Sequence, residues 1–390
     1  MGDLIKAGYR KIFVDAWPIT IAAMLVGTMS IICFTWARPW GVVGGMRVWA
    51  DWLFYGIGLY SKAPKSVLLD TNSVITLGLI YGAFGAALVA KKFAFRFPPR
   101  MEVYKAMIGG TLMGFGASWA GGCNIGGFYS AISALSLSGF SMAVGLIAGA
   151  YLGLKYLYWE MEHFPSAAGG AAPDDEGKKG FDWSKVKPLL GWIVLLGGYA
   201  AFQIYRYEGY TIIGGIFLCG MAFGVILNRA NFCFARAFRE PFMTGEAEVP
   251  RAVIISIMIS VVGFAILKWS GFRTEGTYVT ATFGLGSLVG GFIFGFGMLL
   301  AGGCGSGTAW RVAEGQVKLM VVLVFFASSN SLTRVWVSSS KTLQTIKGFK
   351  VYLPDYLGYE ITVFFIFGLL LLWYLLVCYN EETDKFVVEM

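Results

Sequence analysis

Long runs of apolar residues recur along the whole chain and constrain its fold more than any other feature. Each run is close to the roughly 20 residues that an α-helix needs to cross a bilayer. Of the 390 residues, 57% are hydrophobic and 14% are charged, whereas soluble domains carry about 25% charged residues. The runs lack the apolar–polar alternation of barrel strands. The sequence therefore predicts an all-α polytopic membrane protein, embedded in the lipid bilayer.

The runs predict about nine or ten transmembrane helices, accompanied by short re-entrant half-helices. Ten spans would put both termini on the same side of the membrane. With that side cytoplasmic, the inner segments hold 20 Lys and Arg residues and the outer segments hold 11. The positive-inside rule therefore favours a cytoplasmic N-terminus and C-terminus. The ten segments are 17–36, 73–92, 103–119, 139–159, 187–205, 211–228, 251–268, 282–301, 317–335 and 359–379.

One stretch differs in composition from the rest of the chain. It contains an Ala/Gly-rich run at 167–172, followed by the acidic sequence Pro-Asp-Asp-Glu at 173–176. Such a composition is typical of a flexible, solvated linker. We therefore expect a first membrane repeat half at 1–159, a cytoplasmic linker at 160–186 and a second membrane repeat half at 187–390.

An internal repeat supports the division into halves. Residues 109–126 read GGTLMGFGASWAGGCNIG and residues 290–307 read GGFIFGFGMLLAGGCGSG, with ten of 18 positions identical and no gap. A weaker match joins 79–95 to 218–234, with seven of 17 positions identical. The span order makes the strong pair run in opposite directions and the weak pair in the same direction. We predict an inverted duplication from the strong pair. The parallel weak pair indicates either one inserted crossing in the second half or one miscounted span.

A short apolar segment follows each Gly-Gly-Cys sequence. Segments 124–136 and 305–315 are too short to cross the bilayer and too apolar for an ordinary loop, so each predicts a re-entrant turn and a half-helix. The first N–H groups of such a helix carry partial positive charge and suit an anion. Each turn would therefore present one thiol, Cys123 or Cys304, and several N–H donors in the middle of the membrane.

The glycines of the repeat fall into two groups. Glycines spaced four residues apart within the spans favour tight helix packing, namely Gly110, Gly114, Gly291 and Gly295. Glycines beside the cysteines favour the re-entrant turns, namely Gly121, Gly122, Gly302 and Gly303.

The six cysteines differ in their expected roles. Three lie within apolar runs and are expected to be small hydrophobic residues, namely Cys33, Cys219 and Cys378. Cys123 and Cys304 occupy equivalent repeat positions, which packing alone does not require. Cys233 lies in the basic segment 228–236. Two arginines in that segment favour an anion or a thiolate, or they are positive-inside residues on a cytoplasmic helix.

Other chemistries find little support. The single histidine, His163, leaves no pair of axial haem ligands, and no Cys-x-x-Cys or zinc-type spacing occurs. Arg311 and Glu314 lie three residues apart and most simply form an ion pair. No long basic cluster interleaved with aromatic residues suggests nucleic acid as a partner. We expect no catalytic residues, no metal and no cofactor.

The motifs resemble the YeeE/YedE family of bacterial membrane proteins, especially its YedE-like members. The resemblance rests on GGTLMGFGASWAGGCNIGGF at 109–128, NRANFCFARAFREPFMTG at 228–245 and GFGMLLAGGCGSGTAWRVAEGQ at 295–316. It implies an inner-membrane transporter for a small sulfur-containing anion, thiosulfate in the best-understood members, with selenium metabolism linked to some. It also implies a small cytoplasmic sulfur-carrier protein as a partner.

In the thiosulfate carriers, membrane cysteines line a central constriction and pass the substrate along through weak S–H contacts. Three cysteines of this chain match the family's cysteine motifs. With their neighbours they form the predicted substrate-binding set, which is Cys123, Cys304, Cys233, Gly122, Asn124, Gly303, Gly305, Ser306 and Arg236.

Two other functions remain as alternatives to a transporter. The chain could be a membrane sulfur transferase, or the anchor of a sulfur- or selenium-metabolising complex, with Cys233 as a persulfide-carrying nucleophile. It could also be a structural subunit of a respiratory complex that docks through the aromatic-rich segment 36–60. We favour the non-enzymatic transporter because a thiol holds a soft sulfur atom weakly and releases it, as conduction requires.

Overall fold

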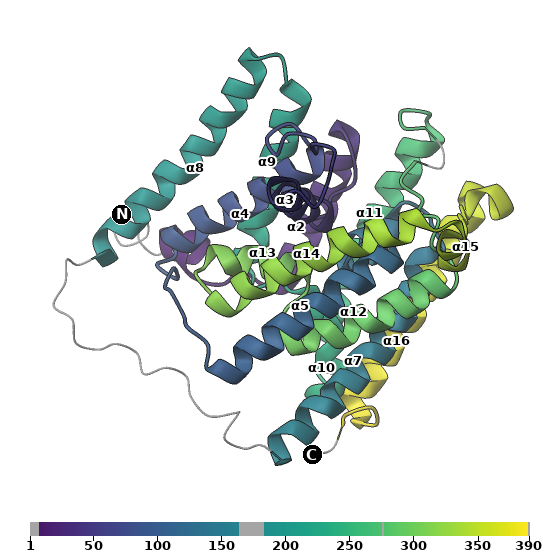
Figure 1. The fold of residues 1–390 in the computed structure, drawn as a ribbon. Helices are drawn as coiled ribbons and strands as arrows, with labels where there is room; N and C mark the ends of the chain where they lie inside the picture. Colours follow the sequence, from purple (N-terminus) through teal and green to yellow (C-terminus); the bar gives the residue numbers. More distant parts are fainter. Residues whose placement is uncertain (1–7, 164–182, 275–276, 389–390) are drawn as a thin grey trace.

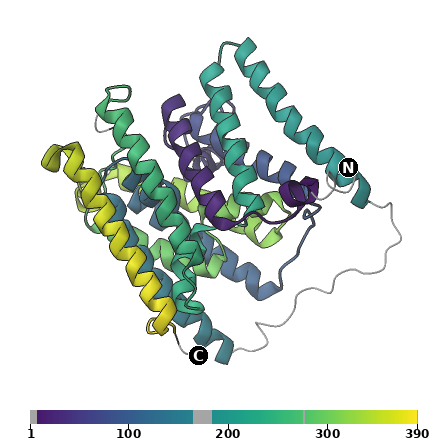
Figure 2. The ribbon, with the colours of Figure 1, turned by 180° about the vertical axis from the view of Figure 1, so that it is seen from behind.

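The computed structural model describes residues 8–163, 183–274 and 277–388. Within these residues nearly all regular structure is helical, and extended pairing is limited to three isolated bridges. Ten helices are long (Figures 1 and 2): α2 (Ile19–Trp36), α4 (Thr71–Val89), α5 (Arg100–Ala120), α7 (Ser138–His163), α8 (Trp183–Tyr207), α9 (Thr211–Arg229), α11 (Glu248–Trp269), α12 (Leu285–Ala301), α14 (Val317–Ser339) and α16 (Pro354–Thr383). The shorter helices are η1 (Arg10–Val14), α3 (Val43–Gly56), η2 (Asn124–Tyr129), α6 (Ser130–Ser133), α10 (Phe234–Met243), α13 (Gly305–Ala313) and α15 (Lys341–Lys347).

Each predicted span coincides with one long helix. Nine segments of the described chain are long and apolar enough to cross a membrane. The tenth long helix, α5, has 21 residues and begins with Arg100, Glu102 and Lys105, which lower its hydropathy. The prediction of an all-α multi-pass membrane protein is confirmed. The predicted linker lies mostly outside the described residues, and the division into halves at 160–186 stays a prediction.

The two copies of the strong repeat cross each other in antiparallel directions. A Cβ at Gly109 would lie 2.6 Å from the backbone nitrogen of Ala301, and one at Gly116 would lie 2.6 Å from the carbonyl oxygen of Gly290. Residues early in α5 therefore meet residues late in α12, as an inverted duplication requires. The expected packing role of Gly110, Gly114, Gly291 and Gly295 is also confirmed, since a Cβ at each would meet backbone of a neighbouring helix at 2.5–2.8 Å.

The order of the helices extends the inverted repeat beyond the matched sequences. Helices α2, α3, α4, α5 and α7 correspond in order to α9, α10, α11, α12 and α14. Equivalent helices also make equivalent contacts. Helix α4 packs along α9, and the equivalent pair is α11 along α2. Helix α5 packs along α14, and the equivalent pair is α12 along α7.

The weak sequence match has a different origin. It joins α4 to α9, which are parallel as predicted, but which contact each other directly and are not equivalent elements. Glycines on both helices allow that contact, since a Cβ at Gly82 would lie 2.1 Å from the carbonyl oxygen of Met221 and one at Gly224 would lie 2.0 Å from that of Leu79. Helix α11 has its counterpart in α4, and the long helices of the predicted second half that have no counterpart in this order are α8 and α16.

Four short helical segments begin in the middle of the bundle. We define face A as the membrane face at which α2 ends with Trp36, and face B as the face at which α2 begins with Ile19. Helix α3 and the η2–α6 segment run from the centre towards face A, whereas α10 and α13 run towards face B. The described chain begins and ends on face B, which agrees with the predicted placement of both termini on one side (Figure 1).

Gly290 offers a test of the central crossing. A Cβ there would lie 2.5 Å from the backbone nitrogen of Ala120, so Gly290→Ala forces α5 and α12 apart. We expect it to cost about 1–3 kcal/mol, the range of overpacked cores, and to lower the thermal unfolding midpoint in detergent. Gly368→Ala is the matched control, because nothing lies within 4 Å of a Cβ in that position of α16. An unchanged midpoint in Gly290→Ala would contradict the packing described here.

Candidate functional site

The starting points of the four central helices define the candidate site. The residues immediately before α3, η2, α10 and α13 are Val42, Cys123, Cys233 and Cys304, and all four are buried. Three of the four helix starts therefore carry a thiol, and Val42 occupies the fourth position. The first N–H groups of an isolated helix have no intrahelical partner and carry partial positive charge.

The two Gly-Gly-Cys turns have nearly the same backbone. Gly121 and Gly302 both adopt φ of 80°, a left-handed conformation that favours glycine. The following cysteines are extended, with φ and ψ of −82° and −169° at Cys123 and of −83° and −176° at Cys304. Each cysteine carbonyl then accepts a bond from the fourth residue along, at 2.7 Å in both turns. The sequence identity therefore reflects one turn built twice, and the predicted re-entrant turns are present.

The three thiols gather around the first turn of α13. The Sγ atoms of Cys233 and Cys304 lie 3.9 Å apart, and the Cys304 thiol accepts a bond from the Gly307 N–H at 3.4 Å. A Cβ at Gly305 would lie 3.0 Å from the Cys123 Sγ, and one at Gly307 would lie 3.0 Å from the Cys233 Sγ. Glycine at these two positions lets the sulfur atoms approach the backbone of α13.

The other predicted site residues are distributed as follows. Asn124 is buried and donates to the Met298 sulfur at 3.5 Å, while the hydroxyl of Ser306 lies 3.5 Å from the Cys304 Sγ. Gly122 and Gly303 belong to the turns themselves. Arg236 lies on α10 and forms an ion pair with Glu240 of the same helix. The structure thus brings the thiols, Asn124 and Ser306 into the centre and turns Arg236 towards a carboxylate.

Two buried polar atoms at this centre have no hydrogen-bond partner within the described chain, the Asn124 Oδ1 and the Thr308 Oγ1. Buried polar groups normally find a partner, and each exception needs an explanation such as a ligand or water. Thr308 was not predicted. It lies one helical turn after Cys304, and that spacing was the available signal.

Arg311 and Glu314 do not bind each other as predicted. The Arg311 guanidinium donates to the Gly302 carbonyl at 2.8 Å, whereas the Glu314 carboxylate accepts from the Asn228 amide at 2.9 Å. The first contact ties α13 back onto the re-entrant turn, and the second ties α13 to α9. Both residues therefore stabilise the half-helix that carries the Cys304 turn.

A cavity of about 760 Å³ leads from face A to the Cys123 turn. We call it the vestibule. Its floor includes Gly122 and Cys123, and no carboxylate is found among the described residues that line it. The charged side chains among these described lining residues are cationic, namely Arg38, Arg47, Arg334 and Lys347. None of these four was predicted, because they come from separate loops and helices that only the fold brings together.

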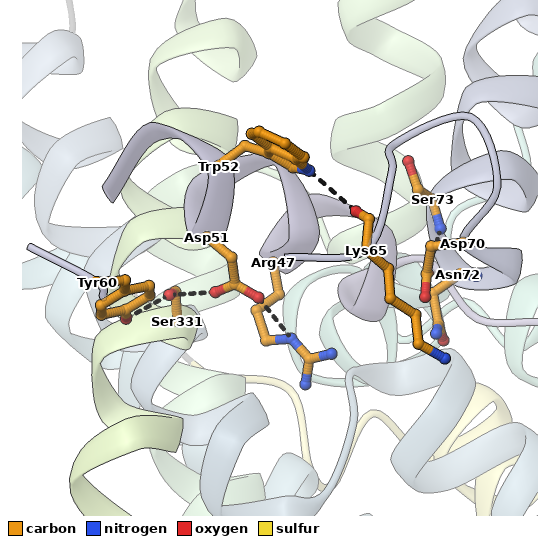
Figure 3. A network of polar contacts seen from close by, with 9 residues as sticks. All are labelled: Arg47, Asp51, Trp52, Tyr60, Lys65, Asp70, Asn72, Ser73 and Ser331. Carbon is orange, nitrogen blue, oxygen red and sulfur yellow. Dashed lines mark hydrogen bonds and ion pairs between the residues drawn. The ribbon is translucent and has the colours of Figure 1, made fainter. Parts of the chain in front are cut away.

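Polar partners hold two of the vestibule cations in place. Arg38 donates to the Thr71 hydroxyl at 3.2 Å and to the Asn72 side chain at 2.5 Å. Figure 3 shows the partners of Arg47. Its Nε lies 3.6 Å from the Asp51 carboxylate, which accepts a bond from the Ser331 hydroxyl at 2.5 Å, and Tyr60 lies 2.7 Å from the same hydroxyl. The cationic surface is therefore preorganised.

Lys347 lies on α15, outside the spans. Burial and the nearby Arg334 lower the pKa of Lys347 from 10.5 to about 8. The lysine is charged below pH 8 and loses its charge as the pH rises above 8. The vestibule thus carries four cationic groups at neutral pH and three in alkaline solution.

The arrangement as a whole suits a small anion. Cationic groups form the entrance, and cysteine side chains and backbone N–H groups form the centre. Within the described residues no group of three His, Cys, Asp or Glu side chains could hold a metal ion.

A family model described as sulphur transport matches residues 5–152 and 229–389 of the chain. The chain belongs to this sulphur transport family. The matched ranges contain all four central helix starts and leave out α8 and most of α9. The family resemblance inferred from the cysteine motifs is thereby confirmed.

Named relatives agree with the family assignment. The chain is 29% identical over 314 residues to a probable transporter YedE of Escherichia coli K12, and 27% identical over 314 residues to the Salmonella typhimurium LT2 protein of that name, with 77% of each chain covered in both cases. It is also 32% identical over 124 residues to the thiosulfate transporter TsuA of Escherichia coli K12, which covers 32% of this chain and 34% of the relative.

The pKa of Lys347 gives a prediction about anion binding at the vestibule. We expect thiosulfate affinity of the purified protein to fall about three- to tenfold between pH 7 and pH 9, as one charge beside a dianion is lost. Lys347→Arg keeps its charge throughout this range and should abolish most of the fall. Isothermal titration at both pH values checks this, and an equal fall in wild type and Lys347→Arg would contradict a role for this lysine.

Proposed function

We propose that this protein is a non-enzymatic transporter of a small sulfur-containing anion, with thiosulfate as the type of substrate. One observation carries the proposal above the others. Three thiols, from helix starts in both inverted repeats, lie around the first turn of α13, and one of them, that of Cys123, belongs to the floor of a cationic vestibule. The names of the relatives, which include a thiosulfate transporter, support the same substrate class.

The vestibule would capture the anion, and the central cysteines would let it pass through the membrane. The vestibule cations attract a dianion from solution and supply partners for its oxygen atoms. The centre offers Cys123, Cys304 and Cys233 as weak S–H donors, together with N–H groups at helix starts. Two arginines close to the cysteines in sequence or space have partners within the chain, because Arg311 donates to the Gly302 carbonyl and Arg236 pairs with Glu240. Weak S–H and N–H contacts would then hold the anion strongly enough for entry and weakly enough for release.

We propose the inner membrane of a bacterial cell as the location, with face B cytoplasmic. The Lys and Arg count supports this orientation, because the segments predicted on the side of the termini hold 20 of the 31 Lys and Arg residues, and the described chain begins and ends on face B. The vestibule then opens outward and collects substrate from outside the cytoplasm. A small cytoplasmic sulfur-carrier protein would receive the anion at face B.

The alternatives have less support. A persulfide-carrying Cys233 was suggested by its expected exposure to the cytoplasm, yet the residue is 1% exposed and faces Cys304. The aromatic segment 36–60, suggested as a docking surface, contributes the central helix α3. Within this segment Trp40 is buried and stacks on Phe223, with ring centroids 4.1 Å apart.

The thiol role is tested by single alanine substitutions. We expect Cys123→Ala, Cys304→Ala and Cys233→Ala each to reduce thiosulfate uptake about tenfold or more, as the loss of one hydrogen-bond donor of about 1.5 kcal/mol predicts. Uptake of radiolabelled thiosulfate into cells without another thiosulfate transporter is the measurement, with growth on thiosulfate as sole sulfur source as a second readout.

Cys378→Ala is the matched control. This cysteine lies on α16, away from the central turns, and is half-buried. It should leave uptake unchanged, with expression of all variants compared by immunoblot. Full uptake in all three central variants at normal expression would refute the proposed thiol pathway.

A further inference from the structure

A second cavity lies on face B, opposite the vestibule. It measures about 330 Å³ and is lined by residues from α5, α7, α10, α12 and α14. Three of its walls are α10, the end of α12 and the end of α7. In the inverted repeat these elements correspond to α3, the end of α5 and the end of α14, which line the vestibule. We call it the face B cavity. Its charged lining residues are Glu102, Lys105, Glu160, Arg239 and Lys318.

A chain of ion pairs occupies the face B cavity. The Lys318 Nζ lies 2.5 Å from one oxygen of Glu102, and the Lys105 Nζ lies 2.9 Å from the other. Lys105 also lies 2.9 Å from Glu160. One carboxylate of α5 is thus held between two lysines, and the chain of charges links α14, α5 and α7.

The position of Lys318 connects this chain of charges to the Cys304 turn. A Cβ at Gly302 would lie 3.3 Å from the Lys318 Nζ. Gly302 precedes Cys304 by two residues and forms the left-handed start of the re-entrant turn. An anion that leaves the thiols towards face B along this turn would meet the Lys318 ammonium group.

The charges of the described residues that line the cavity do not balance. Among them, Lys105, Lys318 and Arg239 exceed the two carboxylates by one positive charge. The Arg239 Nε is buried and has no hydrogen-bond partner in the described part of the chain. In the vestibule one described cation, Arg47, lies beside a carboxylate, that of Asp51, whereas here the chain's own carboxylates form ion pairs with two of the three described cations, Lys105 and Lys318. The arrangement matches that of an anion site filled by an internal carboxylate.

We propose that the face B cavity is a second anion-binding site, with Lys318, Lys105 and Arg239 as its ligands and the Glu102 carboxylate as the group that an arriving anion displaces. The inference rests on the proposed transport function and extends it with an exit site. The ligand class is a small sulfur-containing dianion. Displacement is an exchange of ionic partners in which no covalent bond changes. Glu102 then sets how tightly the exit site holds the substrate, because it competes for the same two lysines.

Opposite shifts in affinity test this assignment. Thiosulfate, with sulfate as a second probe, is titrated calorimetrically into the purified full-length protein. Glu102→Gln removes the competitor, so we expect thiosulfate to bind about tenfold more tightly. Lys318→Gln removes a ligand, so we expect about tenfold weaker binding, whereas Lys318→Arg should bind nearly as wild type does. A purely structural ion pair would give weaker binding, or no change, in both glutamine variants.

The ion pair of Arg251 with Glu381, 3.0 Å apart on the same face and outside the cavity, supplies the control. Glu381→Gln changes the net charge as Glu102→Gln does and should leave affinity unchanged. If Glu102→Gln and Lys318→Gln both bind thiosulfate with wild-type affinity, or both bind it more weakly, the proposed exit site is refuted. The proposed transport function would not be affected by that result. If the wild-type protein neither binds nor transports thiosulfate or sulfate, the proposed function is refuted, and the exit site, which rests on that function, is refuted as well.

Discussion

Backbone N–H and C=O groups at membrane depth need partners, and this constraint governs the whole bundle. Four helices begin in the middle of the membrane, so their first N–H groups must be walled off from lipid by the surrounding long helices. The wall is tight because glycine lets backbones meet, as at the crossing of Gly116 with Gly290. Around the first turn of α13 this packing brings the thiols of Cys123, Cys233 and Cys304 close to backbone N–H groups such as that of Gly307. Helix-start N–H groups favour an anion, and the proposed transport function rests on this combination.

The parts predictable from sequence were those fixed by local backbone needs. The Gly-Gly-Cys turn requires a left-handed residue, a helix end and a helix start within four residues. This requirement explains why the same residues occur at the turn in both halves of the chain. Helices α3 and α10 were missed as central helices, because neither is preceded by that turn. Their equivalence appears only in the packing. The weak sequence match between α4 and α9 arises from glycines that let these two helices pack closely on each other. The match therefore resembled an internal repeat although the two helices are not equivalent elements.

The vestibule could not be predicted for a different reason. Arg38, Arg47, Arg334 and Lys347 lie far apart in sequence, and in a linear count they are ordinary outer-loop charges. The fold gathers them on one surface and places the partners of Arg38 and Arg47 beside them. Cations of a membrane protein can set its orientation or bind a ligand, and only their neighbours in three dimensions distinguish the two roles. The fold class, by contrast, follows from span length alone.

The inverted repeat has a consequence for motion. The two halves are built alike but inserted upside down, and in this structure they surround mouths of unequal size, about 760 Å³ at face A and about 330 Å³ at face B. In transporters built from inverted repeats, an exchange of shape between the two halves narrows one mouth and widens the other. The duplication supplies the geometric basis for such an exchange between two states related by a two-fold axis in the membrane plane.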